Sequence, residues 1–329
     1  MLLRCYIGGC SRLVALLLAV LLLHAPAVVA AGHAEADIYV VLSNDTEEYR
    51  QIEKRIVEGL RDSRHYGKRL RTMLAASLDP SRPGHWPAAD AEVVVAVGMR
   101  ALKALLEGPS GFPIYAVFVP YASYHALLDE PAPGSGASRR RHLSVLYLDQ
   151  PPRRQLKLAA TIDRSFRRLG ILLSEDLPID VDALREAAAD LGLTLRPVRV
   201  SERRDVVPAL KRAQRRIDLL ITVFDPAIIS TQSLRQILYF SYNRRLPVIG
   251  YSRAMVRAGA LAAVYSDAEQ VGRQAAETLI EALDRSPIGL PPSAFPDYFS
   301  ASCNEAVRAY FNLPADCHLK DFARGGEGR

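Results

Sequence analysis

From Asp37 almost to the end of the chain, short apolar runs alternate with segments of helical period, and this alternation restricts the fold strongly. The clearest buried strands are Val93–Val97 and residues 219–224. Strands separated by helices of this length are typical of parallel sheets covered by helices on both faces. The alternation runs through two cycles, with further strands expected at residues 38–42, 70–76, 114–119, 143–148, 169–173, 195–200, 247–250 and 262–265. The pattern therefore predicts an α/β protein with two doubly wound parallel-sheet lobes.

The N-terminus has the three parts of a secretory signal peptide. Arg4 and Arg12 precede an uninterrupted apolar run at residues 13–23, and small residues follow at 25–31. A basic region, a short apolar core and a small-residue cleavage site are the parts of such a signal. The apolar run is shorter than the about 20 residues that span a bilayer comfortably. We expect residues 1–31 to be removed and the remainder to be exported.

We expect cleavage near Ala30 or Ala31, with Ala36 as a second choice. Two other fates of this segment, an uncleaved anchor and a lipid anchor at Cys10, are less consistent with its pattern. The sequence around Cys10 resembles a lipoprotein box, but it precedes the apolar run, whereas a true box ends it. A lipid attached at Cys10 would leave the whole apolar run in the mature protein, so we reject this reading.

Charge and cysteine content agree with an exported globular protein. The net charge of +6 is carried by arginines scattered along helix faces, without the interleaved aromatics that would indicate a nucleic-acid partner. After loss of Cys5 and Cys10, only Cys303 and Cys317 remain, and in an oxidising compartment we expect them to form one disulfide. A pair of free thiols is the alternative. The histidines are scattered, so we expect no metal site and no cofactor.

The second half of the chain resembles a known family. The segments that carry the resemblance include a Pro-Val-Ile-Gly strand followed by an Arg-x-Gly-Ala-Leu segment and a Gly-Arg-Gln-Ala helix. They lie at residues 168–172, 184–193, 217–221, 246–250, 256–263, 269–276 and 304–314. Together they resemble ABC-transporter substrate-binding proteins with the type I periplasmic binding protein fold, in the branch related to aromatic-amino-acid binders. The resemblance covers about residues 37–312.

This resemblance implies two lobes joined by a three-segment hinge, a periplasmic location and a monomer. The same fold serves sugar repressors, but a signal peptide occupies the place of their DNA-binding domain, so that function is excluded. The chain is expected to cross between lobes near residues 149–152, 265–267 and 286–290. The expected boundaries are 37–149 plus 267–286 for the N-terminal lobe, 150–266 plus 287–300 for the C-terminal lobe, and 301–329 for a terminal helix and tail.

Ligands of open parallel sheets bind beyond the carboxyl ends of the strands, which gives a set of candidate residues. Free N–H groups at the Gly98–Met99 helix start favour a ligand carboxylate, and Asp225 suits an ammonium group. Tyr121 and Tyr251 are placed to stack on an aromatic or sugar face. These residues describe a zwitterion clamp. The remaining candidates at the same strand ends are Asn44, Asp45, Pro120, Pro226 and Ser252.

Some of these candidates have an alternative structural reading. Asn44 and Asp45 precede a predicted helix and suit a cap, and Asp225-Pro226 is a common turn and cap pair. The cleft motifs also depart from the family, which usually has an Ala-Thr-Pro type turn at the position of Gly98–Met99. A ligand unlike those of better-known relatives is therefore expected, or a loss of affinity.

Three functions are compatible with these features to different degrees. The leading prediction is a periplasmic solute-binding protein that closes on a small molecule, amino acid-like or another organic solute, and delivers it to an ABC permease. A sensory or accessory module, reporting to a membrane signalling protein or an outer-membrane receptor, is the alternative. The sequence has no Gly-x-Ser-x-Gly, P-loop or His-Glu-x-x-His motif, so we do not expect an enzyme.

Overall fold

The computed structural model describes residues 37–109, 111–129, 142–285, 287–314, 317, 319 and 322. Residues Ala36–Arg329 form one compact unit that contains two sheets. The expected signal peptide, which includes the Cys10 segment, lies outside the described residues. No helix in the described part of the chain has the length and apolar character needed to cross a membrane.

The first sheet is fully parallel, with the strand order β2-β1-β3-β4-β5. The strands β1 and β3 are buried at every position because they are built of apolar residues and Tyr39 and are covered on both faces. This burial explains why they appear in the sequence as continuous apolar runs. The strands are β1 (Ile38–Leu42), β2 (Leu70–Leu74), β3 (Val93–Val97), β4 (Ile114–Val119) and β5 (Leu143–Tyr147).

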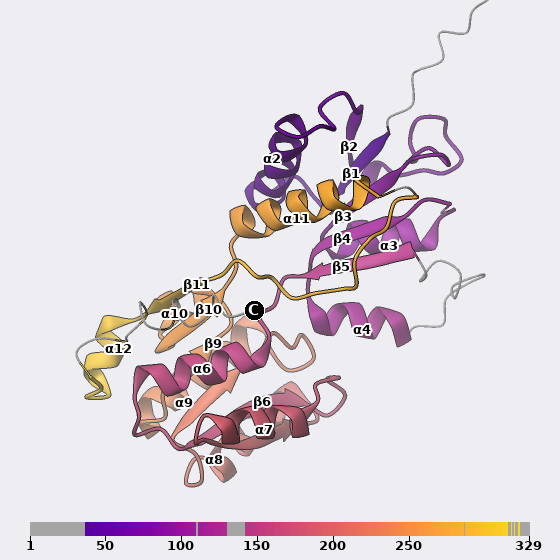
Figure 1. Ribbon diagram of the computed structural model, residues 1–329. Helices are drawn as coiled ribbons and strands as arrows, with labels where there is room; N and C mark the ends of the chain where they lie inside the picture. Colours follow the sequence, from indigo (N-terminus) through magenta and orange to yellow (C-terminus); the bar gives the residue numbers. More distant parts are fainter. Residues whose placement is uncertain are drawn as a thin grey trace, which may run out of the picture. The chain divides into compact units, whose positions relative to one another are not determined.

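Two helices from opposite ends of the chain cover one face of this sheet. α2 (Glu47–Arg61) and α11 (Ala268–Leu283) lie side by side and share one apolar core (Figure 1). Gly59 permits this packing, because a Cβ there would lie 2.7 Å from the Cβ of Ala276. The helix after residue 267 thus packs on the first sheet. The other face carries η1 (Ala75–Ser77), α3 (Met99–Glu107) and α4 (Tyr121–Asp129).

The second sheet has the order β11-β10-β9-β8-β6-β7, and all its neighbours are parallel except β10 and β11. Its strands are β6 (Arg168–Ser174), β7 (Thr194–Val200), β8 (Leu219–Thr222), β9 (Val248–Gly250), β10 (Ala262–Tyr265) and β11 (Ser300–Cys303). The sequence predicted two parallel-sheet lobes, which the structure confirms. It did not predict the antiparallel edge strand β11.

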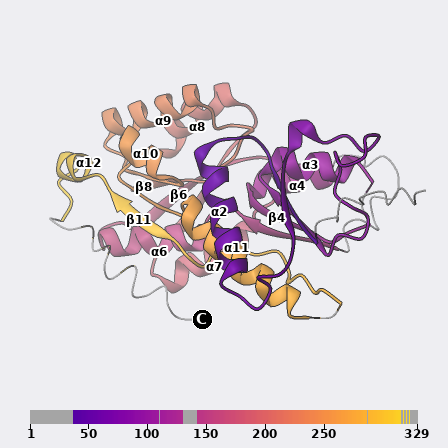
Figure 2. The same cartoon turned by 90° about the horizontal axis from the view of Figure 1, so that it is seen from above.

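Helices cover both faces of the second sheet (Figure 2). α6 (Pro152–Ile162) and α7 (Val181–Asp190) pack on one face, and α8 (Val206–Ala213), α9 (Thr231–Arg244) and α10 (Arg253–Ala258) on the other. The short η3 (Arg203–Asp205) precedes α8, and α12 (Glu305–Tyr310) follows β11. The disulfide between Cys303 and Cys317, as predicted, joins the end of β11 to the C-terminal segment.

The third connection between the sheets differs from the prediction. We expected residues 287–300 to belong to the C-terminal lobe, with a crossing near 286–290. Instead, the N–H of Ala294 donates to the carbonyl of Val145 at 2.8 Å, and Tyr147 N–H donates to the carbonyl of Ala294 at 3.0 Å. Residue 294 therefore extends the first sheet beside β5, and the chain crosses to the second sheet between there and β11. The other lobe boundaries remain predictions.

Candidate functional site

The predicted residues at the end of β1 serve the start of α2. The Asn44 side chain accepts a hydrogen bond from the Thr46 N–H at 3.2 Å, and the Asp45 carboxylate pairs with Arg50. Both side chains are exposed, and neither lines the cavity described below. Asn44 thus forms a turn before α2, whose N-cap residue Thr46 makes no side-chain cap hydrogen bond, and Asp45 forms an ion pair.

The Gly98–Met99 turn is tightly packed. Gly98 has a φ of 85°, and a Cβ there would lie 2.7 Å from both the Ser43 hydroxyl and the Tyr49 ring. The same Ser43 hydroxyl accepts the N–H of Ala101 at 3.0 Å, so the first sheet already satisfies one of the donors at this helix start. Met99 packs against the apolar core. The turn is not part of the cavity wall.

Asp225 holds two strand ends together. Its side chain is 1% exposed, and its carboxylate accepts the N–H of Ser174 at 2.8 Å and that of Ala227 at 3.2 Å. Both carboxylate oxygens of Asp225 therefore accept backbone N–H groups, as expected for a turn or cap residue. Neither oxygen is left free for a ligand by this arrangement. The carbonyl of the adjacent Pro226 accepts from Arg203 at 2.5 Å.

Ser252 and Pro120 also serve the starts of helices. The Ser252 hydroxyl accepts the N–H of Met255 at 3.3 Å and caps α10. The Pro120 carbonyl accepts the N–H of Tyr124 at 2.9 Å in the first turn of α4. Neither residue lines the cavity.

A cavity of about 390 Å³ lies where the carboxyl ends of strands from both sheets meet. This volume is in the range of small-molecule sites. Of the predicted ligand residues, Tyr121 and Tyr251 line it, and the others do not. The rest of the wall is formed by Asp149, Gln150, Pro151, Pro152, Arg153, Gln155, Leu177, Ile179, Asp180, Ala183, Leu184, Ala187, Val223, Phe224 and Phe295.

Aromatic pairs contribute to the wall from each sheet. Tyr121 stacks on Phe295 with ring centroids 5.5 Å apart, and both side chains pack against the core of the first sheet. Phe224 meets Tyr251 edge to face at 5.6 Å, at the ends of β8 and β9. The Tyr121 hydroxyl also donates to the carbonyl of Pro178 at 2.9 Å and so joins the two sides of the cavity.

Asp149 is the partly buried carboxylate of this wall. Asp149 lies two residues after the end of β5. Its carboxylate accepts the N–H of Tyr121, the first residue of α4, at 2.5 Å. Burial raises the pKa of Asp149 to about 6, although the hydrogen bond from Tyr121 opposes the shift. Burial, followed by the nearby charge of Asp149, raises the pKa of Tyr251. The carboxylate is therefore mostly ionised at neutral pH, at an energetic disadvantage.

Gln155 supplies a second acceptor. Its side chain is 1% exposed, and its Nε2 donates to the carbonyls of Thr222 at 2.8 Å and Gly250 at 3.1 Å. Those two bonds fix the amide so that Oε1 is the remaining atom, and Oε1 has no hydrogen-bond partner among the described residues. A buried acceptor without a partner is unusual in a native structure, and here it belongs to a residue of the cavity wall.

A chain of hydrogen bonds beside the cavity connects the three segments between the sheets. Gln150 Nε2 donates to the Ser266 hydroxyl at 2.7 Å, which in turn donates to the carbonyl of Tyr298 at 2.5 Å. Arg154 donates to the Gln150 side-chain oxygen at 2.5 Å and lies over the Phe299 ring, 4.2 Å from its centroid. This arrangement fixes the relation between the crossing segments next to Asp149.

A larger hollow of about 650 Å³ runs along the edge strand β7. Its walls come from α7, β7, α8 and adjoining residues of the second sheet alone, whereas both sheets contribute to the smaller cavity. Five arginines line it: Arg185, Arg196, Arg199, Arg212 and Arg216. The smaller cavity is the candidate ligand site, because ligands of open parallel sheets bind at the ends of the strands.

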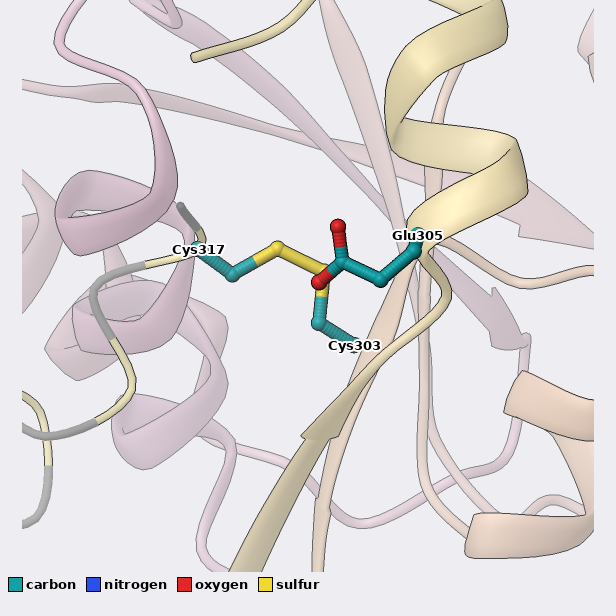
Figure 3. A group of neighbouring side chains, drawn as sticks. All are labelled: Cys303, Glu305 and Cys317. Carbon is teal, nitrogen blue, oxygen red and sulfur yellow. A yellow bond between two sulfur atoms is a disulfide. The ribbon is translucent and has the colours of Figure 1, made fainter. Parts of the chain in front are cut away.

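One group of described side chains has the spacing of metal ligands (Figure 3). It consists of Cys303, Glu305 and Cys317, beside the end of β11. A cysteine binds a metal as a thiolate, and here the two sulfurs are joined in a disulfide. The group is therefore part of the disulfide-linked C-terminal segment rather than a metal centre.

The wall residues that the sequence analysis missed differ in how visible they were. Asp149 directly follows a predicted strand and was assigned to a hinge alone. Gln155 interrupts the apolar face of a helix, which is a detectable pattern. Phe224 was passed over in favour of its neighbour Asp225. Phe295 lies in a proline-rich connection and has no local pattern that would place it in a site.

The comparisons with known proteins agree with this fold. Residues 157–296 match the family model described as ABC transporter substrate binding protein. No curated protein matches the chain. One similar solved structure is the ABC domain in complex with L-Trp from Streptococcus pneumonia, at 16% identity and a TM-score of 0.57, covering 87% of this chain and 98% of that chain.

Two further solved structures have the same fold. The ligand-free, open structure of a substrate binding protein with adhesive properties from Clostridium difficile is 17% identical, with a TM-score of 0.62 over 84% of this chain and 95% of that chain. A conserved domain protein from Vibrio cholerae is 17% identical, with a TM-score of 0.54 over 86% and 97%. These similarities confirm the two-sheet architecture of the type I periplasmic binding proteins.

Proposed function

We propose that this protein, whose residues 157–296 carry the sequence of an ABC transporter substrate binding protein, captures a small molecule between its two lobes. The cavity of about 390 Å³ at the facing strand ends carries the proposal, because residues of both sheets form its wall. The hydrogen-bonded segments around Gln150 and Ser266 supply the hinge. Closure of two domains around a ligand is a common way to hold a solute.

The finer parts of the proposal follow from the sequence. Residues 1–31 would direct export, and the mature monomer would act in the periplasm, where it hands its ligand to an ABC permease. Capture needs no bond to be made or broken, so no catalytic group is invoked. The L-Trp bound to the similar protein of Streptococcus pneumonia supports a small organic solute of amino-acid size as the ligand.

The test is a thermal-shift screen followed by calorimetry. The protein is expressed with its own N-terminal segment, purified, and unfolded and refolded to remove any carried ligand. The panel contains amino acids, amines, organic acids, nucleosides and sugars. A ligand at a hundred times its Kd stabilises the folded state by about 2.7 kcal/mol.

A matched pair of variants locates the binding. Tyr251→Ala removes a ring from the cavity wall, whereas Tyr239→Ala removes one that is 74% exposed on α9. We expect the first to weaken binding of the ligand that the screen identifies and the second to leave it unchanged. Absence of any hit in the panel, or equal effects of the two variants, would overturn the proposal.

A further inference from the structure

The cavity wall offers acceptors in preference to donors. Asp149 presents a partly buried carboxylate, and Gln155 Oε1 is a buried acceptor without a partner among the described residues. Both residues belong to the same wall, and Gln155 Oε1 lies below its accessible surface. A buried acceptor that stays unpaired costs stability, so a bound molecule with N–H groups would remove that penalty.

At the helix starts that line the cavity, the backbone donors are engaged or absent. Pro151 and Pro152 stand at the start of α6, and proline has no N–H to offer an anion. At the start of α7, the Asp180 side chain accepts the N–H groups of Asp182 and Ala183. The helix starts that line the cavity are therefore poor sites for a ligand carboxylate, although helix N-termini ordinarily favour anions.

The first sheet and the Gln155 amide also have no donors to spare here. The N–H of Tyr121, at the start of α4, is bound by Asp149, and the Gln155 Nε2 is bound by two backbone carbonyls. Arg153 is the cationic side chain of the wall, and it is exposed to solvent. An ion pair formed at such a position contributes little.

The aromatic residues complete the chemistry of the wall. The cavity is lined by Tyr121 and Phe295 on one side and by Phe224 and Tyr251 on the other. An ammonium group is attracted to such rings, and the rings also pack against an apolar or aromatic body.

We propose that the cleft binds an organic amine with an aromatic or apolar body, whose N–H groups are held by Asp149 and Gln155. This inference rests on the proposed function and names its ligand class. It replaces the zwitterion clamp expected from the sequence, since Asp225 and the Gly98 turn are engaged within the fold. The raised pKa of Asp149 supports it, because a bound cation would relieve the cost of the buried carboxylate.

The experiment compares matched ligands by calorimetry at pH 7.5 on the refolded protein. Tryptamine and phenethylamine carry the amine alone, L-tryptophan and L-phenylalanine add a carboxylate, and indole-3-propionate and 3-phenylpropionate carry the carboxylate alone. A trimethylated phenethylammonium ion keeps the charge without N–H groups. We expect the amines to bind at least as tightly as the amino acids, the acids not to bind, and the trimethylated ion to bind about tenfold more weakly.

Two pairs of variants test the residues. Asp149→Asn keeps the shape and should weaken amine binding by about 10- to 100-fold, the loss of one charged hydrogen bond. Asp182→Asn removes an exposed carboxylate on α7 that lies outside the cavity wall, and should change binding less than threefold. Gln155→Met is the second test, with circular dichroism to show that the variant is folded. It should weaken amine binding and leave the trimethylated ion unaffected.

The outcomes separate the two proposals. Binding of the acids or sugars but not of the amines would overturn the amine inference and leave solute capture intact. The same holds if the amino acids bind more than tenfold tighter than the amines, or if Asp149→Asn binds amines as the wild type does. Failure of every compound in the panel to bind would overturn both.

Discussion

Replacement of Asp149 by Asn should stabilise the ligand-free protein by an amount that grows between about pH 4 and pH 6 and is complete above about pH 6. Burial raises the pKa of the folded carboxyl from 3.8 to about 6. Because the folded pKa lies above the unfolded value, the protonated Asp149 carboxyl contributes its full stability below about pH 4. That contribution is lost as the pH rises from about 4 through about 6. Each pKa unit corresponds to about 1.4 kcal/mol, so ionisation of Asp149 destabilises the fold by at most about 3 kcal/mol.

The Asn side chain removes that ionisation and keeps the shape. Its Oδ1 still accepts the Tyr121 N–H, which the carboxylate accepts at 2.5 Å. At pH 7.5 we expect Asp149→Asn to be more stable than the wild type by about 1–3 kcal/mol. At pH 4 the two proteins should differ by less than about 0.5 kcal/mol, because the wild-type carboxyl is then protonated.

The assay unfolds both ligand-free proteins with urea at pH 4 and at pH 7.5, and circular dichroism reports the unfolding. Other titrating groups act equally on both proteins, so the change in their difference isolates Asp149. Tyr251, whose pKa is raised, does not titrate in this range. The control is Asp180→Asn, which makes the same change at an exposed carboxylate. A wild type that matches or exceeds the Asn variant in stability at pH 7.5 would refute the reasoning.

Three further predictions concern the Gly98 turn, the disulfide and the hydrogen bond across the cavity. Gly98→Ala should lower the free energy of unfolding by about 2–3 kcal/mol, since its Cβ would lie 2.7 Å from the Ser43 hydroxyl. Gly259→Ala, also at positive φ but with open space around it, should lose less in the same urea titration. Cys303→Ser should remove about 3 kcal/mol of stability in non-reducing calorimetry with unchanged ligand affinity. Tyr121→Phe keeps the ring but loses the cross-cavity hydrogen bond, so Kd should rise about fivefold; an unchanged Kd would contradict this.

The sheets were predictable because their cause is local. Val93–Val97 is fully buried, and that burial is visible as an unbroken β-branched run. β11, with the sequence Ser-Ala-Ser-Cys, has no such run and exists because it pairs with β10. α4 follows Val119-Pro120 and contains Ser and His among its aromatics, without a marked apolar face, so its helical state depends on its surroundings.

The site was only partly predictable, for a physical reason. The rule that ligands lie beyond the strand ends led to Tyr121 and Tyr251, which do line the cavity. The rule does not say which of two adjacent residues faces the ligand. At the end of β8, Phe224 lines the cavity while Asp225 turns inward to bind backbone N–H groups. That choice depends on the partners that the tertiary structure offers to each side chain.

If the amine proposal holds, the position of Asp149 would connect the charge of the ligand to the proposed hinge. It lies between the last strand of the first sheet and Gln150, whose amide begins the hydrogen-bond chain through Ser266 to Tyr298. A cation that neutralises the carboxylate therefore acts one residue from the point where the three crossing segments are joined. Gln155 lies in the first turn of α6, and its side chain donates hydrogen bonds to the last residues of β8 and β9. A ligand amine that bonds both acceptors would contact Asp149, which follows the first sheet, and Gln155, which is bonded to the second sheet. A ligand that contacts both sides in this way would favour the closed form.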